Sequence, residues 1–306
     1  MSEPIAVTVD GRVLRLTNLD KVLYPASGTT KAQVVDYYTR AAPVLLPLLA
    51  GRPVTRKRWP HGVDSETFFE KNLPRGTPEW VTRVSLHHEG ARSGRSPRDL
   101  DYPLVDSVAT LVWFAQAGAL ELHVPQWRID ALGAPRPPDR LVVDLDPGPP
   151  ASIRECSEIA LMARDLLRGH GFDPVAVASG SKGMQLYADL PPDNDAGREV
   201  LARAGSTAEY ARALGEVLAR ALPTLVVTTM KRDARPGRVY IDWSQNNPAK
   251  TTICPWSPRG RERPTVATPL LWSEVEAGKA AHATMDEALA RMSDPRISEL
   301  FAGPDA

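Results

Sequence analysis

Two aspartates, Asp144 and Asp146, follow an apolar run in the segment LVVDLDPG. The run is typical of a buried strand that the Pro-Gly pair ends, and residues i and i+2 of a strand point to the same face. Two carboxylates side by side repel each other unless a cation lies between them, and Mg²⁺ and Mn²⁺ prefer oxygen ligands. Asp242 in VYIDW is a third acid on an apolar strand. Three carboxylates that hold two divalent ions are typical of nucleotidyl transfer, whereas a D-x-D pair taken alone is more often a turn cap.

Small and basic residues fill the segment SGSKG at 179–183, which we expect in the turn of a hairpin. Small residues let backbone N–H groups approach an anion, and Lys182 adds a point charge for phosphate. The segment is not a Walker A loop, because G-x-x-x-x-G-K-[ST] occurs nowhere in the chain. A plain glycine-rich turn is an equally good explanation of this segment alone.

Basic and aromatic residues alternate in RKRW at 56–59 and FFEK at 68–71. This pattern suits phosphate contact combined with base stacking, and a charged strand face over core aromatics is the competing interpretation. His123 in ELHVPQW stands alone in an apolar strand, so its default interpretation is a core histidine. The chain has eight lysines among 37 basic residues. Lys binds phosphate as a point charge, whereas Arg forms two parallel hydrogen bonds to it. Six lysines lie in these or similar segments: Lys21, Lys31, Lys57, Lys71, Lys182 and Lys250.

Composition limits the classes of protein that fit this chain. Its 306 residues suggest two domains or one large one, and equal numbers of basic and acidic residues mean that any basic surface must be local. The two cysteines exclude a disulfide scaffold or a cysteine-rich zinc module and suit a reducing compartment. No signal peptide and no 18-residue apolar run are visible, so we expect a cytoplasmic protein without a membrane span. HExxH, GxSxG, GxGxxG and CxxC are absent, which disfavours zinc proteases, hydrolases, Rossmann enzymes and redox proteins.

The elements that must position these residues are strands and helices in irregular alternation. A helix should follow Thr29-Thr30 and break near Pro43, and the polar segment 191–205 reads as a loop or hinge. Further helices are expected at about 107–119, 152–168 and 207–221 and in the tail from about 270. Strands or hairpins are expected at 5–16, 54–59, 67–71, 121–129, 141–148, 174–190, 225–229, 237–243 and 251–256. This order favours a mixed α/β fold over a doubly wound parallel sheet.

The ordered set of segments closely resembles the polymerase domain of bacterial DNA ligase D, in the archaeo-eukaryotic primase superfamily. The segments are LTNLDKVLYP, GTTKAQVVDYY, GRPVTRKRWPHGV, FFEKN, LELHVPQWR, LVVDLDPG, SGSKG, YIDWSQN, KTTICPWSPRGR and PTVATPL. The resemblance covers about residues 12 to 276. It implies one primase-polymerase domain over 1–306, an α+β fold with a primase-like core in which an N-terminal αβ unit packs against a unit related to the RNA-recognition fold. We expect an N-terminal lobe at about 1–135, a catalytic lobe at about 136–270 and a helical tail at 271–306.

The resemblance also assigns roles to residues that match the family. Asp144, Asp146 and Asp242 would hold two divalent ions, Mn²⁺ or Mg²⁺. The nucleotide contacts would be Lys57, His123, Ser179, Lys182, Gln245 and Arg259, with His123 near the sugar. The pocket for a DNA 5′-phosphate would be Asn18, Lys21 and Lys31. Contacts to the template and to paired DNA ends would come from Arg58, Phe68, Phe69, Lys71 and Arg235.

One position departs from the family motif S-G-S-K-G-x-His. Gln185 stands where that histidine, which helps to bind the triphosphate, would be. A Gln side chain donates a hydrogen bond but carries no charge. We therefore expect weaker nucleotide binding than in a His version, without loss of activity.

These matches predict a template-dependent transferase that adds nucleotides, ribonucleotides preferentially, to DNA 3′-ends at gaps and double-strand breaks in non-homologous end joining. The expected partners are gapped, nicked or broken DNA with a 5′-phosphate, NTP or dNTP, Ku and an ATP-dependent DNA ligase, at the nucleoid. Two alternatives remain at this stage. One is a primase that starts strands de novo, and the other is a non-catalytic module that binds DNA ends and recruits a ligase.

Overall fold

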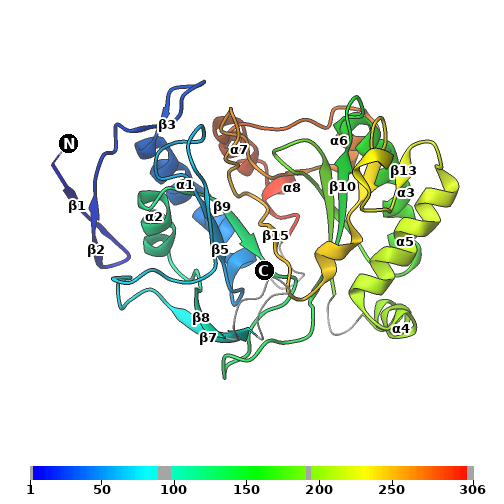
Figure 1. Ribbon diagram of the computed structural model, residues 1–306, viewed down its shortest axis with the longest axis horizontal. Helices are drawn as coiled ribbons and strands as arrows, with labels where there is room; N and C mark the ends of the chain where they lie inside the picture. Colours follow the sequence, from blue (N-terminus) through cyan, green and yellow to red (C-terminus); the bar gives the residue numbers. More distant parts are fainter. Residues whose placement is uncertain (1–2, 89–97, 191–193, 302–306) are drawn as a thin grey trace.

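The computed structural model describes residues 3–88, 98–190 and 194–301, and its two largest sheets lie side by side (Figure 1). The larger sheet has six strands and is antiparallel except for the pair β13 and β14. Its strands, in spatial order, are β13 (Val226–Val227), β14 (Val239–Ile241), β10 (Arg140–Pro147), β12 (Met184–Asp189), β11 (Val175–Ala178) and β16 (Thr268–Leu270). The mixed α/β architecture expected from the sequence is confirmed.

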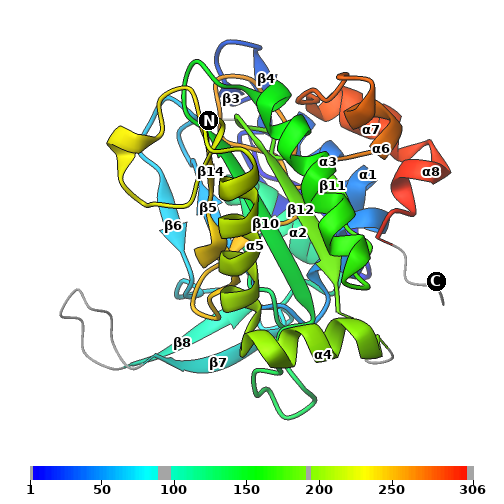
Figure 2. The same cartoon turned by 90° about the vertical axis from the view of Figure 1, so that its right-hand side faces the viewer.

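Helices cover one face of the six-stranded sheet, as Figure 2 shows for α3 (Ile153–Gly169) and α5 (Thr207–Ala221). Alternate residues of β10 point to opposite faces of the sheet. Leu141, Val143 and Leu145 point toward these helices and pack in the core beneath them. Val142 belongs to a separate apolar cluster on the opposite face, with Ile253 and Tyr187. Because Asp144 and Asp146 share the parity of Val142, they are directed away from the helices and toward the other half of the molecule.

The four-stranded sheet forms the second half of the molecule, together with two helices that pack on each other and share its core. Its strands, in spatial order, are β15 (Thr252–Ile253), β9 (Ala119–Val124), β5 (Thr55–Arg58) and β6 (Phe68–Glu70). The helices are α1 (Lys31–Leu49) and α2 (Val108–Gln116). β15 belongs by sequence to the expected catalytic lobe but is hydrogen-bonded to β9, so the chain crosses between the halves at this point.

Short elements complete the fold. They are β1 (Ile5–Val9), β2 (Arg12–Leu16), β3 (Val22–Tyr24), β4 (Thr29–Thr30), β7 (Arg83–His88), β8 (Arg98–Pro103), α4 (Asp195–Ala204), η1 (Arg232–Ala234), η2 (Trp243–Asn246), α6 (Trp272–Glu276), α7 (Met285–Met292) and α8 (Pro295–Ser298). α7 packs on α1, so the C-terminal helices return to the first half of the chain. No helix in the described ranges is long and apolar enough to cross a membrane.

Two expectations about helices were wrong. α1 does not break at Pro43 but continues to Leu49 through a second proline, Pro47. An internal proline costs about 3 kcal/mol. The buried side of α1 outweighs this cost, because each fully buried Leu, such as Leu45 and Leu49, contributes about 1.5–3 kcal/mol.

The second wrong expectation is the loop at 191–205, of which residues 191–193 lie outside the described part. Its second half is the helix α4. The side chain of Asn194 caps this helix by accepting a hydrogen bond from the N–H of Gly197 at 2.8 Å. Val200 and Leu201 then pack against the core beneath α3 and α5. The polar start of the segment therefore marks a helix cap and not a continuing loop.

Candidate active site

The three predicted acids meet at the ends of two neighbouring strands. Asp144 and Asp146 lie on β10, and Asp242 follows β14 directly and donates its N–H to the Asp144 carbonyl at 2.9 Å. Burial, and then the charge of Asp146, raise the pKa of Asp144 well above its usual value. Desolvation of its carboxylate, and then the charge of Asp242, raise the pKa of Asp146 as well. A pair of crowded carboxylates with raised pKa values is the donor set that a divalent cation would relieve.

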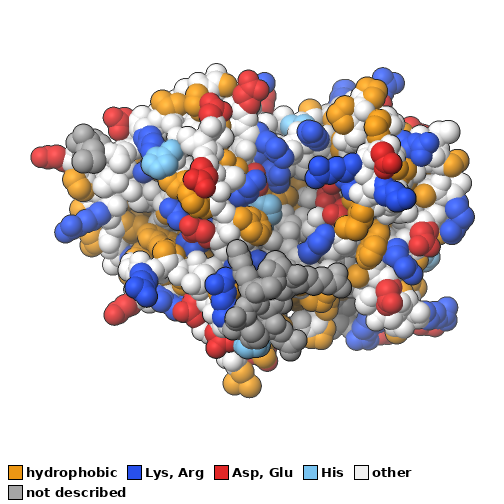
Figure 3. Space-filling model, viewed as in Figure 1, with side chains coloured by type: hydrophobic (Ala, Val, Ile, Leu, Met, Phe, Trp, Pro, Cys, Tyr) orange, Lys and Arg blue, Asp and Glu red, His pale blue; other side chains and the backbone are white. Residues whose placement is uncertain are grey.

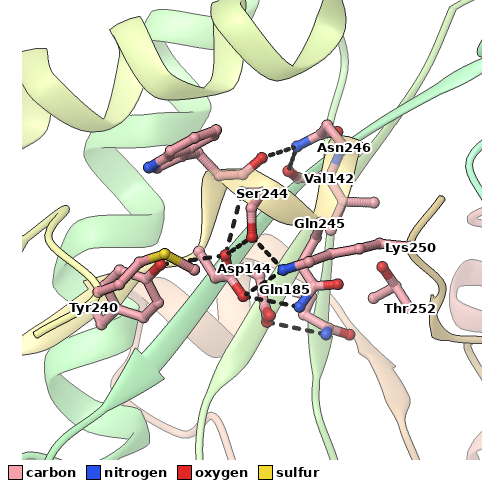
Figure 4. A network of polar contacts seen from close by, with 12 residues as sticks. Val142, Asp144, Gln185, Tyr240, Ser244, Gln245, Asn246, Lys250 and Thr252 are labelled. Carbon is pink, nitrogen blue, oxygen red and sulfur yellow. Dashed lines mark hydrogen bonds and ion pairs between the residues drawn. The ribbon is translucent and has the colours of Figure 1, made fainter. Parts of the chain in front are cut away.

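The Asp242 carboxylate is engaged differently from the other two. Figure 4 labels Tyr240, Ser244, Gln245 and Lys250, the residues that surround it. It accepts hydrogen bonds from the N–H and hydroxyl of Ser244, from the Tyr240 hydroxyl at 3.3 Å and from Gln245 Nε2 at 2.9 Å. The Lys250 ammonium lies 3.7 Å from its Oδ2. Within the described ranges, no three His, Cys, Asp or Glu side chains lie close enough to hold one ion. Among the described residues, Asp144 accepts one side-chain hydrogen bond, from Gln185 Nε2 at 3.0 Å to its Oδ1, and its Oδ2 remains open to a metal. Asp242 would have to exchange its partners to join Asp144 and Asp146.

A pocket of about 300 Å³ lies in front of the two β10 acids. Seven of the residues predicted from the sequence line it: His123, Asp144, Asp146, Ser179, Lys182, Gln245 and Arg259. Arg261, which the sequence analysis did not single out, lines it too. In the space-filling view, Lys and Arg side chains gather around the hollow between the two halves (Figure 3). Carboxylates and cations therefore share one pocket, as a metal–triphosphate ligand requires.

The predicted hairpin turn at 179–183 is confirmed between β11 and β12, and its backbone is tightly constrained. The Ser179 hydroxyl accepts hydrogen bonds from the N–H groups of Ser181 at 3.3 Å and Gly183 at 3.2 Å. A Cβ on Gly183 would lie 1.9 Å from the Leu145 carbonyl oxygen, so only glycine lets the turn approach β10 this closely. The turn carries the exposed Lys182 beside the acids.

Glu121 is the functional candidate that sequence reasoning missed. It is 1% exposed on β9, and its Oε2 lies 2.8 Å from His123 Nε2. Its Oε1 accepts from the N–H of Gly260 at 3.1 Å and lies 3.4 Å from Arg259 Nε. Burial alone would raise the pKa of Glu121, but the His123 hydrogen bond and the Arg259 charge lower it to about 2. The available signal was the spacing: Glu121 and His123 are i and i+2 on a strand and share a face.

The neighbouring strands present two more predicted residues on this face. Lys57 on β5 is paired in register with Glu121, and Phe69 on β6 is paired with Lys57. The Lys57 ammonium lies 4.8 Å from the Trp59 ring centroid. The Phe69 ring, 54% exposed, packs edge-on against His123 with 5.7 Å between ring centroids. Phe68, also predicted, is 39% exposed on the same short strand.

The residues predicted for the 5′-phosphate lie together at the start of α1, apart from the pocket. The N–H of Lys31 donates to the Lys21 carbonyl, and the N–H of Lys21 donates to the Asn18 carbonyl. Lys21 Nζ lies 3.2 Å from His61 Nδ1, a neighbour that the sequence did not reveal. Burial and the charge of Lys21 lower the pKa of Lys31. Two crowded ammonium groups form a site that an anion would stabilise.

The last three predicted contacts lie outside the 300 Å³ pocket. Arg58 donates to both Glu70 carboxylate oxygens, at 2.7 and 2.9 Å, and to the Ala117 carbonyl. Lys71 lines a second, larger cavity of about 500 Å³, and burial lowers its pKa. The Arg235 guanidinium lies 3.8 Å from the Tyr240 ring centroid. These contacts hold Arg58 and Arg235 against protein groups.

A strand end with two acids that faces a cationic glycine turn across a pocket defines a nucleotidyltransferase of the polymerase and primase class. The chain belongs to the family of LigD primase-polymerase domains, whose family model matches residues 30–296. The resemblance found in the sequence is thereby confirmed.

Individual relatives agree with this assignment. The chain is 45% identical over 294 residues to the multifunctional non-homologous end joining protein LigD of Mycolicibacterium smegmatis. That alignment covers 96% of this chain and 36% of the relative. It is 33% identical over 264 residues to the bifunctional LigD of Bacillus subtilis, covering 86% of this chain and 40% of that protein. The chain thus spans little more than a third of the curated relatives that it matches.

A solved structure is similar throughout. The polymerase domain of Mycobacterium tuberculosis Ligase D, solved in complex with DNA, superimposes with a TM-score of 0.82 at 43% identity. The alignment covers 94% of this chain and 98% of that one.

Proposed function

We propose that this chain adds nucleotides to DNA 3′-ends at gaps and double-strand breaks, directed by a template strand, during non-homologous end joining. The observation that carries the proposal is the pocket in which Asp144 and Asp146 face Lys182 and Arg259. The names of the LigD relatives support the repair process, and the DNA complex of the M. tuberculosis domain supports DNA as the partner.

In the proposed reaction, the primer 3′-oxygen attacks the α-phosphorus of the nucleotide, and the bond to pyrophosphate breaks. Asp144 and Asp146, with Asp242 after it exchanges partners, would hold the divalent ions, Mn²⁺ or Mg²⁺. Bound ions supply activation of the attacking oxygen and neutralise charge on the leaving pyrophosphate. Lys182, Arg259 and the turn at 179–183 offset the triphosphate charge, and Gln245 lines the same pocket. Most of the rate enhancement then comes from positioning and charge neutralisation.

The remaining predicted residues would hold the DNA. Asn18, Lys21 and Lys31 would bind the 5′-phosphate across a gap, and Phe68 and Phe69 would stack on the template. Arg58 and Arg235 would need to leave their present contacts to reach DNA. Lys71 would reach it from the cavity that it lines. Ribonucleotide preference, a place at the nucleoid, and Ku and an ATP-dependent ligase as partners belong to the same proposal.

Primer extension on a gapped duplex with a downstream 5′-phosphate tests the proposal. The reaction would contain Mn²⁺ and either NTPs or dNTPs, with the wild type compared with Asp144→Ala/Asp146→Ala. Template-directed addition by the wild type alone is the expected result. End binding without addition by the wild type would instead favour the recruiting module, and primer-free synthesis would favour a primase.

A further inference from the structure

The buried Glu121 carboxylate contacts two residues that face the nucleotide pocket. One oxygen is hydrogen-bonded to His123. The other accepts a hydrogen bond from the Gly260 N–H and forms an ion pair with Arg259. Because both oxygens are used, the carboxylate cannot rotate without losing contacts. The 259–260 backbone is also held from outside, since the Tyr24 hydroxyl donates to the Arg259 carbonyl at 2.9 Å.

The contact between Glu121 and His123 determines where the imidazole proton lies. An ionised carboxylate only accepts hydrogen bonds, so His123 Nε2 must carry the hydrogen of their 2.8 Å contact. Burial lowers the pKa of His123, which favours the neutral ring. In a neutral ring with hydrogen on Nε2, Nδ1 is an acceptor. His123 lines the pocket, and within the described ranges Nδ1 has no hydrogen-bond partner, so this acceptor is available to a ligand.

We propose that Glu121 is a positioning residue that presents His123 Nδ1 as an acceptor for a sugar hydroxyl and orients Arg259 toward the triphosphate. The ligand class is a nucleoside triphosphate whose ribose 2′-hydroxyl donates to Nδ1. A deoxynucleotide lacks this donor and would bind with the acceptor unsatisfied, which disfavours it. This inference rests on the proposed function, because it takes the pocket to be the site of the incoming nucleotide.

Ring packing and strand pairing limit the freedom of His123 around this hydrogen bond. Phe69 packs against it edge-on. Thr55 and Ile253 are its register partners on the strands that flank β9, so His123 lies in the middle strand of three. The Glu121 carboxylate therefore acts on a ring that has little freedom to reorient.

Glu121→Gln tests the proposal, because Gln has nearly the same shape but no charge. The amide oxygen of this Gln must still accept from the Gly260 N–H, so its NH2 group faces His123 Nε2 and donates to it. Nε2 then becomes the acceptor, and the imidazole proton moves to Nδ1. We expect the ratio of NTP to dNTP affinity, measured by titration calorimetry with Mn²⁺, to fall roughly 3- to 10-fold, the effect of one hydrogen bond. Affinity for both nucleotides should fall as well, since Arg259 loses its ionic partner.

Glu274→Gln is the matched control. Glu274 forms a 2.7 Å ion pair with Arg291 in the C-terminal helices, outside the pocket. It should leave both nucleotide affinities unchanged. An equal change in the two variants would overturn the proposal, because it would reflect general destabilisation.

Two further measurements separate positioning from a merely structural role. In a His123→Ala background, Glu121→Gln should no longer change the NTP-to-dNTP ratio, and an undiminished change would contradict action through His123. Nitrogen-15 NMR of the metal-free protein should place the His123 proton on Nε2 in the wild type, and a proton on Nδ1 would refute the proposal. If the wild type bound no nucleotide while its tautomer was as expected, the proposed function would fail and the positioning of His123 by Glu121 would stand.

Discussion

On two sides of the same pocket, the pKa values of buried acids are shifted in opposite directions. On β10, Asp144 is crowded by other acids, and its pKa is raised well above the usual value. On β9, Glu121 is at least as buried but has three cationic or hydrogen-bonding partners, His123, Gly260 and Arg259, and its pKa is lowered to about 2. Burial is common to both acids, so the partners decide the direction of the shift. Within the ranges that the structure describes, Asp144 forms no ion pair, and it is the acid that fits a metal. Glu121 pairs with Arg259 and contacts His123, and it holds these two neighbours in place.

The cluster at the start of α1 repeats the β10 arrangement with the opposite sign. Lys21 and Lys31 are close to each other, and no carboxylate pairs with either among the described residues. Their crowding favours an anion for the same reason that crowded acids favour a cation. In both places the candidate residues are thus those whose charge is left without an ion-pair partner in the part of the chain that the structure describes.

The largest effect is expected where the uncompensated acids are changed. Asp144→Asn should reduce nucleotide incorporation roughly 1,000-fold, because it removes a proposed metal ligand. The same variant should raise the melting temperature of the metal-free protein, since it removes a buried, repelled carboxylate. Primer extension and thermal unfolding in EDTA measure the two effects. A fall in melting temperature in EDTA would mean that the Asp144 charge is compensated after all.

The ion-paired acid, Glu121, should stabilise the folded protein in a way that depends on pH. The folded pKa of Glu121 is below its unfolded value, so its stabilisation is present above about pH 4.5 and is lost as pH falls toward 2. The difference of about 2.5 pKa units corresponds to roughly 3 kcal/mol of unfolding free energy. Urea unfolding at several acid pH values should show this loss in the wild type, and Glu121→Gln should lack this part of it. Parallel curves for the two proteins would refute the assignment.

The lysine cluster gives the next largest effect. Lys31→Met should weaken binding to a gap with a 5′-phosphate about 10-fold, in the range of a charged hydrogen bond. It should leave binding to a gap with a 5′-hydroxyl nearly unchanged. For the wild type, three to four phosphate contacts predict a log–log salt slope of roughly −3, which the variant should reduce by about one. Equal weakening on both substrates would show that Lys31 binds elsewhere on the DNA.

The smallest effect is expected at Gln185. Its Nε2 donates to Asp144 Oδ1 at 3.0 Å, and its Oε1 accepts from the Tyr187 hydroxyl at 2.8 Å. Gln185→His should strengthen nucleotide binding a few-fold by adding a cationic donor, as long as the imidazole keeps the bond to Asp144. Nucleotide titration measures this gain, and an unchanged affinity would show that Gln185 serves only to hold Asp144.

Much of the pocket could be predicted because its residues follow local periodicity. The alternation in LVVDLDPG placed Asp144 and Asp146 on one face, and small residues marked the turn at 179–183 that carries Lys182. The resemblance of ordered motifs added His123, Gln245 and Arg259, all of which line the pocket. The helix break expected near Pro43 and the loop or hinge expected at 191–205 were wrong over the described residues, because buried side chains outweighed local preference.

The sequence by itself determined which strands carry the acids and which faces those acids share, because a strand's period of two depends only on neighbouring residues. Only the tertiary structure decided which charges are compensated. Glu121 meets Gly260 from 139 residues away. Lys250 reaches Asp242 because the chain turns through η2, which packs on β10 and α5. The free energy of a buried charge depends on the partners within a few ångströms, and those partners come from segments that the fold alone brings together.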